Sequence, residues 1–283
     1  MRVAVLTDST SGLTAYRGSD APASVVPLTV ALGDTVYTDG VDLTAATFYG
    51  LLNRQHVVAT TAQPPPALFE DAYTALANDG YDAIVAVHCA TVLSGTVNSA
   101  REAARRAPVT VTVIDTAVIG AALGLSVRAA VRAANDGATP DVVAHAAEQV
   151  ARASRTFFIV DDLDHLRRGG RLKATQAALG QALKIKPLLQ LDVEGHVEVA
   201  QRSRTWARAL EQLAQRAKEQ FSVPVHAAIA HADAPDRAIQ LERQLAVVLR
   251  LTTVEHDVIG PVVGAHVGRG AAGVALVPAN LLG

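Results

Sequence analysis

The sequence predicts an α/β protein built from two domains. In the first half of the chain, short apolar runs alternate with longer Ala-rich amphipathic stretches, which is typical of parallel strands joined by right-handed helical crossovers. After about residue 156, strand pairs separated by short turns are mixed with helices, which indicates a mixed sheet. The length of 283 residues also fits two ordinary domains. We therefore expect domains at residues 1–155 and 156–283.

The N-terminal domain is predicted to be a three-layer α/β/α unit around a parallel sheet. Its strand-like runs are continuous rather than alternating, which is typical of strands buried on both faces. Pro140 fits the first turn of one helix, and Asn135-Asp136-Gly137 ends the helix before it. We expect strands at Val3–Leu6, Ile84–Val87, Val111–Ile114 and Phe157–Val160, and helices at Pro66–Asn78, Ser99–Arg106, Ala121–Asn135 and Pro140–Ala153.

The C-terminal domain is predicted to have two layers, a mixed sheet with helices on one face. The turn Val193-Glu194-Gly195 separates two strand-like runs and predicts a hairpin. Pro224 bounds the long helical stretch that follows. We expect strands at Leu188–Asp192, His196–Ala200, Val225–Ala230, Thr252–His256 and Gly273–Val277, and helices at Thr205–Phe221 and Asp236–Leu249.

The composition excludes several classes of protein. Half of the residues are hydrophobic, which is too many for a disordered chain. The net charge of −2 and the aromatic content of 4% argue against a nucleic-acid partner, which needs phosphate neutralisation and stacking surfaces. Every apolar run is shorter than the roughly 18–20 residues of a membrane-spanning helix, and the N-terminus does not resemble a signal peptide.

The same composition also favours certain properties. The single cysteine, Cys89, has no intrachain partner, so we expect a reducing, cytoplasmic compartment. We expect a monomer, because the sequence does not indicate a large exposed apolar patch. Because aromatic residues are scarce, aliphatic side chains must line any cavity, which suits a flexible hydrocarbon better than a flat ring.

Three hydroxyl-rich segments follow predicted strands or precede predicted helices, where parallel α/β sheets bind polar ligands. A run of short hydroxyl residues directly follows the first strand, two threonines precede a proline-rich helix start, and Gly95 lets the backbone approach an anion closely. Each segment could equally be a simple helix cap or turn. The segments are Thr7–Gly12, Thr60–Pro66 and His88–Thr96.

A cluster of cations surrounds a Gly-Gly turn in the segment Leu166–Lys173. Together with nearby lysines and arginines it predicts a basic face that would suit a phosphate or an acidic partner, although a solvated charge run is the alternative. The nearby residues are Lys184, Lys186, Arg202, Arg204 and Arg208.

His266 stands among small and apolar residues in the segment Gly260–Gly270, with glycines on both sides. This pattern is typical of a loop whose backbone approaches a ligand or forms a hinge, whereas a lone histidine is more often structural. We find no Cys pair and no His spacing of a metal site, so we expect no metal and no cofactor.

Taken in order, these segments resemble the DegV family of bacterial fatty-acid-binding proteins. The resemblance covers nearly the whole chain, and although each motif is weak alone, their common order is specific. The matching residues are Thr7-Asp8-Ser9-Thr10, Thr61-Ala62-Gln63-Pro64, Leu93-Ser94-Gly95-Thr96 with Asn98-Ser99-Ala100, Gly169-Gly170-Arg171, Ile185-Lys186-Pro187, Arg202, and Gly264-Ala265-His266-Val267-Gly268.

The resemblance implies a fold of two α/β domains and a bound long-chain fatty acid. The tail of a C14–C18 acid such as palmitate would occupy an aliphatic tunnel, where each buried methylene contributes about 0.8 kcal/mol. The carboxylate would lie near the interdomain cleft. The protein would be a carrier and not an enzyme, and it would present the acid to a separate fatty acid kinase that forms an acyl-phosphate.

The resemblance also assigns roles to residues. Thr61, Ser94 and the Gly95 N–H would bind the carboxylate, and His266 would close that end from the second domain. Three further residues, Ser9, Gln63 and Thr96, would support the head group, and Arg171 and Arg202 would contact the phosphate or the kinase. Two residues depart from the family pattern: Ala62 replaces the usual Ser, which removes a donor, and Arg269 replaces the usual Pro.

The main alternative is an enzyme. Ser94, His266 and Asp8 could form a triad for hydrolysis or acyl transfer at the strand ends. The sequence lacks the Gly-x-Ser-x-Gly nucleophile elbow, which argues against this alternative. A phosphate-binding or kinase-like domain is a second alternative, suggested by the basic segment, but the chain has no Walker A motif.

Overall fold

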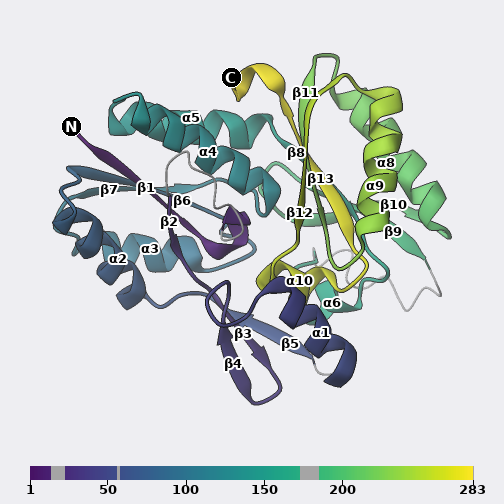
Figure 1. The fold of residues 1–283 in the computed structure, drawn as a ribbon, viewed down its shortest axis with the longest axis horizontal. Helices are drawn as coiled ribbons and strands as arrows, with labels where there is room; N and C mark the ends of the chain where they lie inside the picture. Colours follow the sequence, from purple (N-terminus) through teal and green to yellow (C-terminus); the bar gives the residue numbers. More distant parts are fainter. Residues whose placement is uncertain (14–22, 56–57, 173–184, 283) are drawn as a thin grey trace.

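The computed structural model describes residues 1–13, 23–55, 58–172 and 185–282, and three sheets lie within these ranges (Figure 1). The first sheet has the strand order β2-β1-β6-β7, and all its strands are parallel. Every residue of the two central strands, β1 (Val3–Asp8) and β6 (Ala83–His88), is buried. β2 (Ser24–Val26) and β7 (Thr110–Asp115) form its edges. The central strands therefore bring the segments that follow Asp8 and His88 to the same edge of the sheet.

Helices cover both faces of the first sheet. One face packs against α2 (Pro66–Asn78) and α3 (Thr96–Ala104), and the other against α4 (Ala121–Asn135) and α5 (Pro140–Ala153) (Figure 1). α2 and α5 each begin with a proline, whose fixed φ and missing N–H suit the first turn. This layer order is the predicted α/β/α arrangement.

The second sheet is mixed and has the order β10-β9-β8-β13-β11-β12. Its strands are β8 (Arg155–Ile159), β9 (Lys186–Leu191), β10 (Val197–Ser203), β11 (Val225–His231), β12 (Leu251–Val258) and β13 (Ala272–Pro278). Only β11 and β12 pair in parallel. α8 (Trp206–Gln220) and α9 (Pro235–Val248) pack on one face, and the other face is turned toward the first sheet (Figure 1).

A third, antiparallel sheet of order β4-β3-β5 lies beside the other two. It consists of β3 (Thr29–Leu32), β4 (Thr35–Thr38) and β5 (Ala59–Ala62). Three helices lie near it, α1 (Ala45–Gln55), α6 (Asp164–Arg168) and α10 (Pro261–Val267), and α10 packs against β3 and β5 (Figure 1). Two short 3-10 helices, Ser9–Ser11 and Ala279–Leu281, complete the described elements.

The predicted fold class is confirmed, with a parallel N-terminal and a mixed C-terminal sheet. Two local predictions are wrong. The run at Phe157–Val160 was expected in a parallel sheet, but β8 pairs antiparallel with both neighbours, since an apolar run does not encode strand direction. The segment around His266 was expected to be a loop, but it forms α10, which starts at Pro261 and ends at Gly268 with a φ of 76°.

The third sheet and α1 were not predicted. β3 and β4 have only four residues each, and a run of that length shows too few repeats of the strand period for recognition. None of the helices in the described ranges is long and apolar enough to cross a membrane.

Candidate functional site

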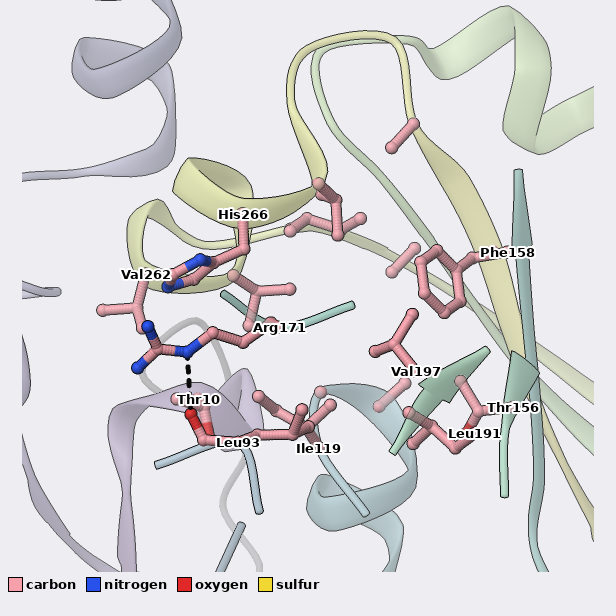
Figure 2. A pocket seen from close by; sticks show the side chains of 18 of the residues that line it. Thr10, Leu93, Ile119, Thr156, Phe158, Arg171, Leu191, Val197, Val262 and His266 are labelled. Carbon is pink, nitrogen blue, oxygen red and sulfur yellow. Dashed lines mark hydrogen bonds between the residues drawn. The ribbon is translucent and has the colours of Figure 1, made fainter. Parts of the chain in front are cut away.

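A cavity of about 330 Å³ lies between the first and second sheets, a volume within the range of small-molecule sites. Its walls come from the loops after β1 and β6, from the face of the second sheet that is turned toward the first sheet, and from β5 and α10. In Figure 2, His266 and Arg171 lie at one end, and Phe158, Val197 and Leu191 at the other. The cavity therefore has a polar end and an apolar end.

At the polar end, Thr61 and His266 are joined across two elements. The Oγ1 of Thr61, on β5, is 2.8 Å from the Nε2 of His266, on α10. Burial lowers the pKa of His266 to about 4, and the charge of Arg171 and the nearby His165 add to this effect. His266 is therefore a neutral imidazole at pH 7, able to donate or accept a hydrogen bond.

The ring of His266 fits against a glycine. A Cβ on Gly169 would overlap the Nδ1 of His266, so a larger residue there would displace the ring. Gly268, at the end of α10, has a φ of +76°, and a Cβ there would lie 2.7 Å from the ring of His165. The glycines predicted to allow close approach thus let α6 and α10 pack closely.

Arg171 is held in place by two backbone carbonyls. Its Nε donates to the carbonyl oxygen of Leu93 at 3.0 Å (Figure 2), and its Nη1 donates to the carbonyl oxygen of Gly169. These bonds orient the guanidinium along the cavity wall beside His266. A cation and a neutral imidazole therefore share the polar end.

Ser94 and Gly95 also line the cavity and lie directly before α3. The Oγ of Ser94 accepts from the backbone N–H of Thr96 at 3.4 Å and lies 2.8 Å from the Oγ1 of Thr96. Thr96 is fully buried and lies behind the cavity wall, where it orients Ser94. When both Thr96 groups donate to Ser94, the hydroxyl proton of Ser94 is free to point into the cavity.

Gln63 packs directly on Gly95. A Cβ on Gly95 would overlap the Gln63 side-chain amide, and the Nε2 of Gln63 donates to the Oγ of Ser99 at 3.0 Å. Gln63 lines the cavity together with its neighbour Ala62. Gly95 is thus required for the contact between the segment after β5 and the start of α3.

Ser9 lies outside this cavity. Its Oγ accepts from the N–H of Leu28 at 3.1 Å, and it also hydrogen-bonds to the buried Asp39. Burial, together with the nearby Asp8, raises the pKa of Asp39 to about 6. Ser9 and Asp39 line an adjacent cavity of about 340 Å³, which shares Thr10 with the first.

The sequence analysis did not single out Thr10 as a cavity residue. Its Oγ1 donates to Asp8 at 2.5 Å, so it presents only acceptor lone pairs to the cavity. Asp8 is fully buried and also accepts from the Nδ1 of His88 at 3.0 Å and from the N–H of Cys89. Burial alone would raise the pKa of Asp8, but these hydrogen bonds outweigh it and hold the pKa below its usual value. Asp8 therefore ties the loop after β1 to the loop after β6.

The proposed triad is not assembled. The Nε2 of His266 faces Thr61, and the carboxylate of Asp8 is bound to His88. Among the described residues, no hydrogen bond links Ser94 to His266. The geometry therefore lacks the nucleophile–base–acid chain that serine hydrolases use.

The expected basic face is neutralised in part where the structure describes it. Lys186 pairs with Asp161 at 2.5 Å, and Arg167 and Arg208 pair with Asp164 and Glu211. Arg202 is exposed on β10, away from the cavity, and no ion pair joins it to a described residue. Lys173 and Lys184 lie outside the described residues.

Arg269 is the residue near His266 that departs from the family pattern. It pairs with Asp233 at 2.6 Å and contacts Asn53.

One group of side chains has the spacing of a metal site within the described ranges. Asp192, Glu194 and His196, in the β9–β10 turn, place one ligand atom each within 4.8 Å of one another. Their backbone hydrogen bonds explain the turn without a metal, because Asp192 Oδ1 accepts from the N–H groups of Glu194 and His196. They lie outside the cavity lining.

Comparison with known proteins gives a consistent result over the whole chain. The profile of the uncharacterised DegV protein family matches residues 2–279. A DegV domain-containing protein of Streptomyces coelicolor is 41% identical over 274 residues, covering 96% of this chain and 97% of its own. Protein DegV of Bacillus subtilis is 30% identical over 278 residues, covering 97% and 98%.

Solved structures of DegV proteins also resemble this chain over nearly its whole length. A Thermus thermophilus DegV family protein, described as binding fatty acid, superimposes with a TM-score of 0.90 at 31% identity and covers 98% of this chain and 100% of its own. The Bacillus subtilis DegV structure, described as a fatty acid binding protein, has a TM-score of 0.88 at 29% identity and covers 98% and 99%.

Proposed function

The chain belongs to the DegV family, and on that premise we propose that it binds a long-chain fatty acid in the cavity between its first two sheets. The observation that carries this proposal is the separation of the cavity into a polar and an apolar end. Related DegV structures are described as fatty acid binding. The carboxylate would lie near Thr61 and His266, and the tail would extend toward Phe158.

Several groups at the polar end suit a carboxylate. Ser94 can donate its hydroxyl proton because its oxygen accepts from Thr96. The start of α3 at Thr96 brings backbone N–H groups and a helix dipole toward the same place, next to Gly95. The Arg171 guanidinium adds a positive charge. Each charge-assisted hydrogen bond contributes about 1.5–3 kcal/mol.

Thr61 and His266 act as a unit in this proposal. When the Nε2 of His266 donates to Thr61, the Thr61 hydroxyl proton is free for the ligand. A bound carboxylate would raise the pKa of His266, since a nearby negative charge favours the imidazolium. The pair thus adapts its donors to the charge of the ligand.

The apolar end suits an acyl tail. Its walls are mostly aliphatic, with Ile119, Leu191 and Val197 among the lining residues. Thr156 is the labelled polar residue at this end, and the Phe158 ring lies there too (Figure 2). Each buried methylene contributes about 0.8 kcal/mol to binding. A saturated chain such as palmitate needs no polar partner along this wall.

We also propose that the protein presents the bound acid to a separate kinase rather than transforming it. Two observations support this role. The triad is not assembled, and the residues proposed to bind the carboxylate lie in the same cavity as Arg171. In this proposal Arg171 contacts the phosphate and the exposed Arg202 contacts the kinase. The residues 1–155 and 156–283 would act as two units that close over the ligand.

Native mass spectrometry of the purified protein tests the proposal. We expect a co-purifying fatty acid, and its loss in the double variant Thr61→Ala with Ser94→Ala. The matched control is Thr60→Ala, because Thr60 is exposed on the same strand. A wild-type protein that stays empty, and that fails to bind palmitate when it is offered, contradicts the proposal.

The kinase role needs a separate assay. Phosphorylation of the bound acid by a bacterial fatty acid kinase should fall when His266 or Arg202 is changed to Ala, while palmitate affinity of Arg202→Ala stays unchanged. Arg204→Ala is the control, since Arg204 is a neighbouring exposed arginine. Equal turnover by all variants contradicts the presentation role only.

A further inference from the structure

A phenyl ring closes the apolar end of the cavity. Phe158 lies in β8, which is an interior strand between β9 and β13. Its neighbours Phe157 and Ile159 are fully buried against α8 and α9, on the opposite face of the sheet. Phe158 itself is only half-buried and lines the cavity at the end opposite His266 (Figure 2). A ligand tail that extends from His266 therefore meets this ring.

Gly273 lies directly across the sheet from Phe158. The two residues are partners in the antiparallel β8–β13 register, and both line the cavity. A Cβ on Gly273 would lie 2.6 Å from the Cβ of Phe158 and 2.8 Å from the carbonyl oxygen of Phe157, closer than real Cβ atoms approach other atoms. Gly273 does not have a positive φ. The site therefore uses the missing side chain, and not the conformational freedom, of this glycine.

From this contact we infer that Phe158 and Gly273 together set the length of the acyl chain that the cavity accepts. The inference rests on the proposed fatty-acid function. Gly273 lets β8 pair closely with β13, and its missing side chain leaves the cavity space beside Phe158 open, so that the Phe158 ring forms the end wall. The ring is a fixed stop, because β8 is paired with β13 on one side and with β9 on the other.

The stop has a measurable consequence. Affinity should rise about fourfold with each added methylene, the equivalent of about 0.8 kcal/mol per buried methylene. The rise should end at the length where the terminal methyl group reaches Phe158. Longer acids would have to displace the ring or coil within the cavity, so their affinity should level off or fall.

The test is a series of dissociation constants for saturated straight-chain acids from lauric to arachidic acid. In Phe158→Ala the Cβ and its contact with Gly273 remain, so only the ring is lost. The break in the series is the chain length at which affinity stops rising. We expect this break to move to longer acids, with an affinity gain of about fourfold for each additional methylene buried. In Gly273→Ala we expect the break to move to shorter acids, because the added methyl group overlaps the Cβ of Phe158 and occupies space in the cavity at the same end.

Leu93→Ala is the matched control. Leu93 lines the cavity near Arg171, at the polar end (Figure 2). Removing its side chain should weaken all acids alike and leave the break in place. Phe158→Ala also keeps the test decisive if Gly273→Ala does not fold.

The outcomes separate this inference from the proposed function. If no acid binds the wild-type protein, the proposed function fails. If acids bind but the break stays at the same length in Phe158→Ala, the function stands and the inference is overturned. A break that moves equally in Leu93→Ala also overturns it.

Discussion

Thr61 and His266 lie 205 positions apart in the chain, yet their side chains meet at a distance of 2.8 Å. β5 of the third sheet carries one and α10 carries the other, and α10 packs against β5. The polar end of the cavity therefore exists only when these two elements are docked. The hydrogen bond couples the binding groups to the packing that holds the cavity together.

Thr61→Val should weaken palmitate binding about 10- to 100-fold, which corresponds to one hydrogen bond to a charged group. Valine keeps the shape of threonine and removes the hydroxyl, which is the donor that His266 orients. A fluorescent fatty-acid displacement assay measures the change. Thr60→Val is the control, because Thr60 is exposed on the same strand. Equal affinities of the two variants would remove Thr61 from the head-group site.

The empty protein should lose stability as the pH falls from about 6.5 to about 4, in part through His266. Burial first, and the charge of Arg171 and the nearby His165 second, lower the pKa of His266 to about 4 from 6.5. Unfolding restores the higher value, so protonation favours the unfolded chain across this interval. His266→Gln should flatten the pH dependence of the melting temperature there. An unchanged slope in the variant would mean that other groups account for the acid sensitivity.

Several elements could be predicted from the sequence because local signals define them. α2, α4 and α5 have the predicted bounds, since prolines begin α2 and α5 and Asn135-Asp136-Gly137 ends α4. The hairpin around Gly195 is also as predicted, with a φ of +90° at that glycine. These features depend on backbone preferences of a few neighbouring residues.

The parts that could not be predicted depend on distant contacts. Nothing near Phe158 indicates that β8 pairs with β13, and the pairing determines which face of β8 lines the cavity. His266 was singled out, but its helix was missed because it is short and Gly264 in its middle lowers the apparent helix propensity. Thr10 was named only as part of a motif, since its place in the cavity follows from the bond to Asp8.

Gly95→Ala should weaken palmitate binding by about tenfold or more, the equivalent of about 1.4 kcal/mol. The added methyl group would overlap the Gln63 side chain, which must then leave its hydrogen bond to Ser99 or push α3 away. Isothermal titration calorimetry measures the loss. The double variant Gln63→Ala with Gly95→Ala removes the overlapping side chain and should recover part of the affinity. If affinity does not recover, the loss is caused by the backbone at Gly95 and not by the contact with Gln63.

Arg128 on α4 and Glu255 on β12 join the first and second sheets. The Nη1 and Nη2 of Arg128 donate to the two carboxylate oxygens at 2.9 and 2.7 Å, and His226 Nε2 lies 2.9 Å from the same carboxylate. Burial would raise the pKa of Glu255, but the bonds from His226 and Arg128 outweigh it and lower the pKa to about 2. The pair therefore persists at neutral and mildly acidic pH, and its contribution is lost only as the pH falls from about 4.5 toward 2.

Glu255→Gln should lower the free energy of unfolding by about 1–2 kcal/mol at pH 7, because the side chains are about three-quarters shielded from solvent and Arg128 loses its counter-charge. Urea denaturation measures the change. Glu148→Gln is the control, since its partner Arg152 is 74% exposed and such pairs contribute about 0–1 kcal/mol. The difference between the two variants should shrink as the pH falls from about 4.5 toward 2, because Glu255 then becomes protonated in the folded protein as well. Equal destabilisation at pH 7 would show that the bridge between the sheets contributes no more than a surface pair.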